Sequence, residues 1–185
     1  GKLKKYSEAL IFKGKYFVEE FQIPKNTQFY YGADFGYSVD AMWMGRCFIK
    51  ENCLYIPDEV YGVGIEIGEL HKAYETVPDS HDWTIRADSA RPDTINFLTQ
   101  PTVGKDGKDY KGFNIIGAEK GQGSVEDGIE FLRSFERIII HPRCKGAKAN
   151  FENYRWKQDK ITGDILPIPV DKHNHAPDGL RYALE

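Results

Sequence analysis

The sequence has few cysteines, no long apolar run and no excess of basic charge. Its cysteines, Cys47, Cys53 and Cys144, are odd in number and form no Cys-x-x-Cys pair, which argues against a disulfide framework or a structural zinc site. No apolar run approaches the roughly 20 residues that cross a bilayer, and the first residues lack the apolar core of a signal peptide. We therefore expect a soluble protein with no membrane partner, not secreted and located in the cytoplasm.

The net charge of −3 gives no general electrostatic attraction for nucleic acid, because proteins that bind it usually carry a basic domain or stripe. Lysines gather locally instead. Lys105, Lys108 and Lys111 lie in "GKDGKDYKG", and Lys120 follows shortly after. These four are candidate contacts to a phosphate backbone. A solvated loop is the alternative reading of the first three, and Lys120 could instead hold a carboxylate in place or be a plain exposed lysine.

The chain length of 185 residues, with 41% hydrophobic and 29% charged residues, fits one globular domain. Its patterns predict strands at 27–34, 41–50, 53–62, 82–88, 113–118 and 137–142, and helices at 65–77, 91–100, 123–135, 145–156 and from 177 onward. Ser124 and Asp127 have the spacing of a capping box. Turn residues at 104–107 and the segment 160–170 favour β-hairpins. The order predicts a mixed α/β sheet flanked by helices, with an added β-hairpin.

Three acidic residues are notable for their positions. Asp34 and Asp88 end predicted strands, and Asp178 lies in the first turn of the last predicted helix. Sites in open α/β sheets form beyond the carboxyl ends of strands, so these acids can meet in one cleft. Two ionised carboxylates about 4 Å apart repel by about 4 kcal/mol at an effective dielectric of about 20, which calls for a cation between them. All-oxygen ligands favour Mg²⁺ or Mn²⁺, although aspartates at such positions also cap turns and helices.

Several blocks of the sequence carry a family resemblance: "GADFGYSVDA", "IRADSARPDTINFL", "GAEKGQGSVEDGI" and "NYRWKQDKITGDILPIPVDKHNHAPDGLRYAL". Together they resemble the C-terminal nuclease domain of tailed-bacteriophage terminase large subunits, over about residues 27–185. The resemblance implies a ribonuclease H-like fold and a metal-dependent endonuclease that cuts concatemeric double-stranded phage DNA during genome packaging. It assigns Asp34, Asp88 and Asp178 to a metal-binding triad and places His175 beside the metals.

The resemblance also implies partners. These are double-stranded DNA, the terminase small subunit, the portal protein and an ATPase motor domain of the same polypeptide, in the cytoplasm of an infected bacterium. The resemblance places the ATPase motor in a separate N-terminal domain, and no Walker-type Gly-x-x-x-x-Gly-Lys-[Ser/Thr] pattern occurs in this chain, so we expect it to cut without hydrolysing ATP. Residues 1–26 are expected to be a lead-in from that preceding ATPase domain, and 27–185 the nuclease domain.

A two-metal mechanism follows as a hypothesis. One ion would be held mainly by Asp34 and Asp178, and a second would be shared by Asp34 and Asp88, with the division open to reversal. Sequence preference should be weak, because nothing resembles a base-reading helix and the lysines address phosphate.

Three alternatives stay open on the residues. "DFGYS" is similar to the phosphate loop of actin-like ATPases, but that fold normally needs two such loops in a much longer chain. A ribonuclease H-like recombination nuclease or junction resolvase would use the same acids, and a non-catalytic DNA-binding module would use them structurally. The C-terminal block favours the terminase reading.

Overall fold

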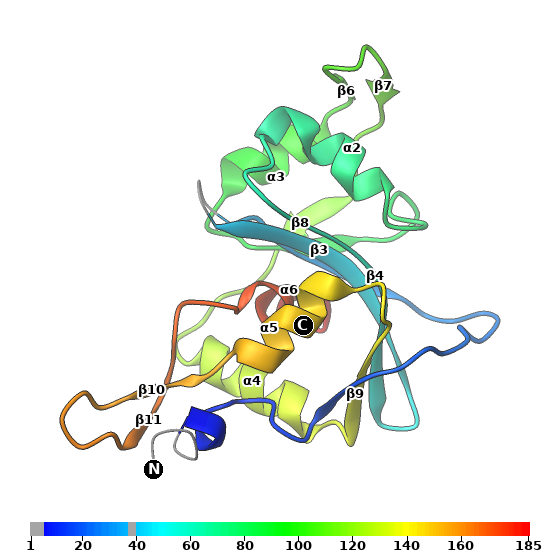
Figure 1. Ribbon diagram of the computed structural model, residues 1–185. Helices are drawn as coiled ribbons and strands as arrows, with labels where there is room; N and C mark the ends of the chain where they lie inside the picture. The colour runs from blue at the N-terminus through cyan, green and yellow to red at the C-terminus, as the bar shows by residue number, and fades with distance from the viewer. Residues whose placement is uncertain (1–5, 37–39) are drawn as a thin grey trace.

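The computed structural model describes residues 6–36 and 40–185 (Figure 1). Within this part of the chain a seven-stranded sheet has the order β1-β9-β4-β3-β2-β5-β8. Its strands are β1 (Tyr16–Val18), β2 (Tyr30–Asp34), β3 (Ala41–Lys50), β4 (Cys53–Val63), β5 (Ile85–Ala87), β8 (Ile115–Gly117) and β9 (Arg137–Ile140).

Helices cover both faces of the sheet, with α2 and α3 on one face and α4, α5 and α6 on the other (Figure 1). They span Leu70–Glu75 (α2, preceded by a 3₁₀ turn η1, Ile67–Glu69), Pro92–Thr99 (α3), Ser124–Ser134 (α4), Lys145–Asn153 (α5) and His175–Ala183 (α6). Two small hairpins complete the fold: β6 (Thr102–Val103) with β7 (Asp109–Tyr110), and β10 (Trp156–Gln158) with β11 (Ile165–Pro169). The predicted mixed sheet, flanked by helices and carrying added hairpins, is confirmed.

Strands β2, β3 and β4 form the predicted antiparallel meander. The β3–β4 turn contains Glu51 and Asn52 at φ 51° and 59°, and two positive φ angles give the twist that a tight hairpin needs. All other neighbouring pairs in the sheet are parallel. Consequently β2, β4, β5, β8 and β9 all end at one side of the sheet, the carboxyl edge.

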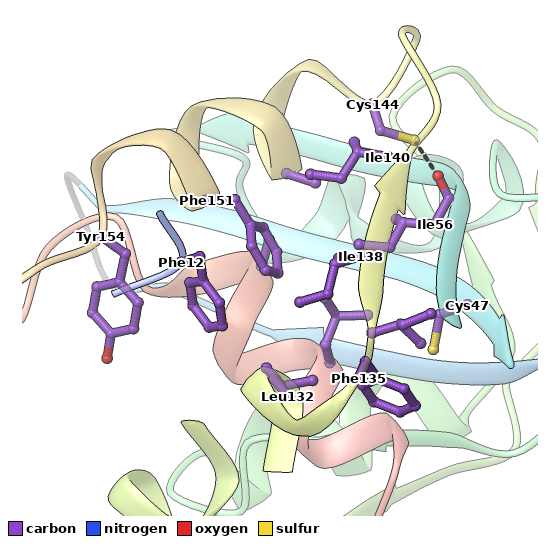
Figure 2. Packing of buried hydrophobic residues seen from close by; sticks show 14 of the residues in the cluster. Phe12, Cys47, Ile56, Leu132, Phe135, Ile138, Ile140, Cys144, Phe151 and Tyr154 are labelled. Atoms are coloured by element: carbon purple, nitrogen blue, oxygen red, sulfur yellow. Dashed lines mark hydrogen bonds between the residues drawn. The ribbon is translucent and has the colours of Figure 1, made fainter. Parts of the chain in front are cut away.

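The core lies on both faces of the sheet because side chains alternate along β3. Trp43 and Cys47 join the cluster beneath α4, α5 and α6, whereas Met42 and Met44 join the cluster beneath α2 and α3. Figure 2 shows the first cluster, in which the Cys144 thiol donates to the carbonyl of Ile56 at 3.5 Å. The three cysteines are free, two of them buried, so the expectation of no disulfide among them is confirmed.

Four local predictions need correction. Helix α4 begins after Gly123 at φ 79°, without a side-chain cap, so the predicted Ser124–Asp127 capping box is wrong. The helix predicted over 145–156 ends at Asn153, because Tyr154 turns into the core and Trp156 begins β10. The helix predicted over 65–77 is a 3₁₀ turn followed by the short α2, and the last helix begins at 175 rather than 177.

Residues 6–26 are part of this fold. Their strand β1 pairs in parallel with β9, and Ile11 and Phe12 are buried in the core. Phe12 packs on Phe151 of α5 with ring centroids 4.6 Å apart (Figure 2). A preceding ATPase domain stays a prediction. Among residues 6–36 and 40–185, no helix has the length and apolar character needed to cross a membrane.

Candidate active site

Two of the predicted acids lie side by side at the carboxyl edge. Asp34 is the last residue of β2, and Asp88 follows β5 directly. The parallel register pairs Ala33 with Ala87, and the backbone N–H of Asp88 donates to the carbonyl of Ala33 at 3.1 Å. The sheet therefore fixes both carboxylates at the same level of neighbouring strands.

Helix α6 brings the third acid to this edge. It packs against β2 so closely that a Cβ on Gly32 would lie 1.8 Å from the carbonyl oxygen of Gly179. Glycine is thus required at position 32, since any side chain there would push the backbones apart, and a Cβ on Gly179 would lie 2.3 Å from the ring of Trp43. Asp178 precedes Gly179 and lies in the first turn of α6, which places it beside the end of β2.

These acids line one hollow of about 400 Å³ together with His175, Lys120 and Arg181. Asp40, Asp171 and Asn174 also line it. The side chains of Asp34, Asp178 and His175 are between 12% and 16% exposed, so water reaches them only from the hollow. The structure thereby brings together all four predicted catalytic positions.

Each acid of the triad contacts a basic side chain. His175 Nδ1 lies 2.9 Å from Asp34 Oδ2, Lys120 Nζ pairs with Asp88 Oδ1, and Arg181 Nη2 lies 2.9 Å from Asp178 Oδ1. Asp88 Oδ1 also accepts from the backbone N–H of Ala90 at 2.9 Å. These partners offset the mutual repulsion of the carboxylates.

Burial and charge shift two pKa values here. Burial raises the pKa of Asp178 to about 6, and the charge of Asp34 adds to this effect while Arg181 opposes it. Burial lowers the pKa of His175, but the hydrogen bond and charge of Asp34 outweigh it, so the net shift is upward. The hollow therefore favours a protonated His175 against an ionised Asp34.

The carboxylates suit Mg²⁺ or Mn²⁺, which take oxygen ligands. Among the residues that the structure describes, no three His, Cys, Asp or Glu side chains are grouped closely enough to hold a metal ion as they stand. The protein's own cations occupy one oxygen of each acid instead. A metal at Asp34 or Asp88 would bind the carboxylate oxygen that His175 or Lys120 does not contact, or would displace that cation, and the assignment of the triad as ligands stays a prediction.

The predicted DNA-binding lysines fall into two places. Lys120 lines the hollow. Lys105, Lys108 and Lys111 lie on or beside the β6–β7 hairpin, which extends beyond α2 and α3 on the far side of the sheet from α6 (Figure 1). Lys105 pairs there with Glu66, and all three side chains are exposed and do not line the hollow. Their contact with DNA stays a prediction.

Sequence reasoning missed the two polar residues that hold Asp178 in the hollow. Asn174 Nδ2 donates to Asp178 Oδ2 at 3.1 Å, and Arg181 holds the other oxygen. Asn174 and Arg181 stand four residues before and three after Asp178, the spacings at which helical side chains meet. That spacing was the available signal for both.

A family model described as "Terminase RNAseH like domain" matches residues 34–185. Among relatives, the large terminase subunit of Bacillus phage SPP1 is 33% identical over 163 residues, which cover 83% of this chain and 35% of that protein. The PBSX phage terminase large subunit of Bacillus subtilis (strain 168) is 27% identical over 101 residues, covering 55% of this chain and 21% of the relative. The chain thus spans about a third or less of these relatives.

Solved structures share the fold. The nuclease domain of the SPP1 large terminase, g2p, crystallised with bound Mn, has a TM-score of 0.76 and 28% identity, covering 92% of this chain and 96% of that one. The P22 large terminase nuclease domain has a TM-score of 0.63 at 15% identity, covering 93% and 87%. The nuclease of phage G20c with bound magnesium has a TM-score of 0.59 at 14% identity, covering 95% and 96%. The chain belongs to the terminase RNase H-like domain family, and its resemblance to the nuclease domain of phage terminase large subunits is confirmed.

Proposed function

We propose that this chain is a metal-dependent endonuclease that cleaves concatemeric double-stranded viral DNA during genome packaging, with weak sequence preference. One observation carries the proposal: Asp34, Asp88 and Asp178 line a single hollow at the carboxyl edge of an RNase H-like sheet. The Mn bound to the SPP1 nuclease domain supports a divalent metal at this edge.

Two Mg²⁺ or Mn²⁺ ions, when bound, would lower the pKa of an attacking water and stabilise the departing 3′ oxygen. Asp34 is the carboxylate we assign to both ions, because it stands between Asp88 on the neighbouring strand and Asp178 on α6. Asp88 would complete the protein ligands of one ion, and Asp178 those of the other. The hydrogen bond to Asp34 holds His175 at the same hollow, where it can release a proton when Asp34 takes up a cation.

The lysines would bind the DNA backbone without reading bases. Lys120 pairs with Asp88, and in the proposal it transfers to a phosphate oxygen when a metal occupies that carboxylate. Lys105, Lys108 and Lys111 would add contacts along the flanking duplex, which fits weak sequence preference because phosphate contacts carry no direct sequence information.

The proposed setting is the packaging machinery of a phage in the cytoplasm of its bacterial host. Its partners would be double-stranded DNA, an ATPase motor domain in the same polypeptide, the terminase small subunit and the portal protein. The large-subunit relatives, which are about three to five times longer than the matched region, support the presence of further domains in such proteins.

Supercoiled plasmid incubated with Mn²⁺ tests the proposal. Wild-type protein should convert it to nicked and linear forms, while Asp34→Asn, Asp88→Asn and Asp178→Asn should each lower the rate by at least about 100-fold, more than the loss of a residue that only supports a ligand. Asp82→Asn is the matched control, because Asp82 is exposed and lies before β5, at the end opposite Asp88.

The outcomes separate the competing functions. Undiminished cutting by all three variants would remove the proposed site, and plasmid binding without metal-dependent cutting would favour a non-catalytic DNA-binding module. A strong preference for four-way junctions over linear duplex would favour a junction resolvase.

A further inference from the structure

Asp178 is held by two side chains that share the hollow with it. Arg181 donates to Asp178 Oδ1 from both Nε, at 3.2 Å, and Nη2, at 2.9 Å. Asn174 Nδ2 donates to the other oxygen, Oδ2, at 3.1 Å. A carboxylate oxygen accepts about two hydrogen bonds, so Oδ1 is saturated and Oδ2 keeps one free acceptor position.

Arg181 is itself held from a second helix. Its Nη1 donates to the backbone carbonyl of Ser124 at 3.0 Å, at the start of α4. The side chain is 7% exposed, so the guanidinium is almost completely enclosed. One planar group therefore joins α4 to Asp178, and its remaining freedom is small because its donors have fixed directions.

A glycine on α4 makes room for this arrangement. A Cβ built on Gly128 would lie 2.2 Å from Arg181 Cδ and 2.9 Å from its Cγ, far inside van der Waals contact. Glycine is otherwise unfavourable inside a helix, and Gly128 is in the middle of α4. The cost is explained if the Arg181 side chain must pass across α4 at this point.

We propose that Arg181 is a positioning residue that turns Asp178 so that Oδ2 alone faces the hollow, and that Gly128 sets the path of the Arg181 side chain. The inference rests on the proposed function, since it takes Asp178 as a ligand for Mg²⁺ or Mn²⁺. Arg181 contacts neither DNA nor metal in this scheme, and acts only through Asp178.

Two variants test geometry without removing charge. Arg181→Lys keeps the positive charge but loses the planar fork. Gly128→Ala removes no polar atom, but its added Cβ displaces the Arg181 side chain. Arg133→Lys is the matched control: Arg133 also pairs with an acid three residues before it, Glu130, but on the outer face of α4. Isothermal titration with Mn²⁺ alone and plasmid nicking over a range of DNA concentrations are measured for each.

Both test variants should bind Mn²⁺ about 10- to 100-fold more weakly and nick more slowly, with an unchanged KM for DNA, the range found when residues supporting a metal ligand are removed. The control should match wild type. The double variant should be little worse than either single one, because both act through the same side chain. Wild-type Mn²⁺ affinity in folded Arg181→Lys would overturn the proposal, since charge alone would then suffice.

A purely structural role for Arg181 would lower the melting temperature and leave Mn²⁺ affinity unchanged well below it, which also overturns the proposal. If Arg181→Lys does not fold, Gly128→Ala decides, because alanine favours the helix and any loss of Mn²⁺ affinity must come from the displaced side chain. Asp178→Asn separates a failure of the proposed metal site from a failure of the positioning role alone. Unchanged Mn²⁺ binding in that variant refutes the proposed site, whereas loss there with normal binding in the two test variants refutes the positioning role alone.

Discussion

His175 Nδ1 on α6 lies 2.9 Å from Asp34 Oδ2 at the end of β2, a contact between residues 141 positions apart. Both side chains are largely buried, so the pair fixes the start of α6 against the sheet as well as lining the hollow. Because the His175–Asp34 pair joins α6 to β2, the protonation state of His175 affects both folding and the chemistry of the site.

The stability of the metal-free protein should fall as the pH rises above about 6.5. The pKa of His175 is raised above the unfolded value of about 6.5 because Asp34 outweighs the opposing effect of burial. The ion pair therefore contributes fully below about pH 6.5, and its contribution is lost as the pH rises through the folded pKa. Asp178, with a pKa of about 6, titrates mostly below this window.

Urea unfolding in EDTA, measured between pH 5.5 and 8.5, checks this for wild type and His175→Gln. The free-energy difference between the two should narrow as the pH rises. A difference that stays constant across the range would mean that the protonated pair does not stabilise the fold.

Removing the charge of Lys120 should strengthen metal binding and weaken DNA binding. Lys120 Nζ pairs with Asp88 Oδ1, and partly exposed ion pairs are worth about 0.2–1 kcal/mol, so Lys120→Gln should tighten Mn²⁺ binding by a factor of about 1.4 to 5. Titration calorimetry measures the metal, and fluorescence anisotropy measures a labelled duplex. Lys108→Gln, on the distant hairpin, should leave Mn²⁺ binding unchanged. Weaker Mn²⁺ binding in Lys120→Gln would show that the lysine supports Asp88 rather than competing for it.

The acids could be predicted from sequence because they follow recognisable strands or begin a recognisable helix, and strand ends gather at one edge. Their partners were only partly predictable. His175 was expected beside the metals and Lys120 was weighed as holding a carboxylate, but Lys120 follows β8, which joins β5 only in the folded sheet, so nothing local identifies Asp88 as that carboxylate. Gly128 is similar, because a glycine in a helix signals weak helix propensity and not the passage of an arginine from another helix.

Elements were predictable where a pattern was long. The ten-residue β3 and eleven-residue β4 were predicted within a residue of their ends. Among the three-residue strands, β5 and β8 were found inside longer predicted segments, whereas β1 was missed. The helix predicted over 145–156 ran too far for a tertiary reason. The backbone N–H of Trp156 donates to the carbonyl of Ala9 at 2.9 Å, a contact with a remote part of the chain.

Glu59 should be a major contributor to stability although it lies outside the hollow. Its carboxylate accepts from the backbone N–H groups of Gly146 and Ala147 at 2.6 and 2.8 Å and from Trp43 Nε1 at 2.7 Å. Burial raises the pKa of Glu59, and these three hydrogen bonds oppose that shift. Glu59→Ala would leave three donors without their partner, which should cost about 2–3 kcal/mol in urea unfolding at pH 7.

The exposed Glu152 on the same helix as Gly146 and Ala147 supplies the control for Glu59. Glu152→Ala should change the free energy of unfolding by less than about 0.5 kcal/mol. Equal effects of the two alanine variants would mean that the hydrogen bonds from Glu59 to the first turn of α5 add nothing to the free energy of unfolding.

Gly32→Ala should impair both stability and metal binding. The added Cβ would lie 1.8 Å from Gly179 O and 2.9 Å from the side chain of Ala183, so α6 has to move away from β2. Overpacking of this kind costs about 1–3 kcal/mol, and the shift separates Asp178 from Asp34. Gly68→Ala is the control, because a Cβ added at Gly68 would meet no atom within 4 Å. Urea unfolding and Mn²⁺ titration of both variants should show losses at position 32 alone.

The hairpin lysines provide a prediction that does not depend on catalysis. Each phosphate contact adds about 0.9 to the slope of log binding constant against log salt concentration, so replacing Lys105, Lys108 and Lys111 by glutamine should lower the slope by about 2.7 if all three touch DNA. Anisotropy with a labelled duplex in EDTA measures it without cleavage. Lys25 and Lys50, which line a separate hollow together, are the control pair and should leave the slope unchanged.

An unchanged slope in the triple variant would mean that the hairpin is a solvated loop whose lysines do not contact DNA. The pairing of Lys105 with Glu66 makes an intermediate value informative too. A lysine already neutralised by a carboxylate releases fewer counterions from DNA than a free one, so restoring only Lys105 should change the slope less than restoring Lys108. Replacing Glu66 by glutamine should remove that difference, because Lys105 would then be as free to meet a phosphate as its neighbours are.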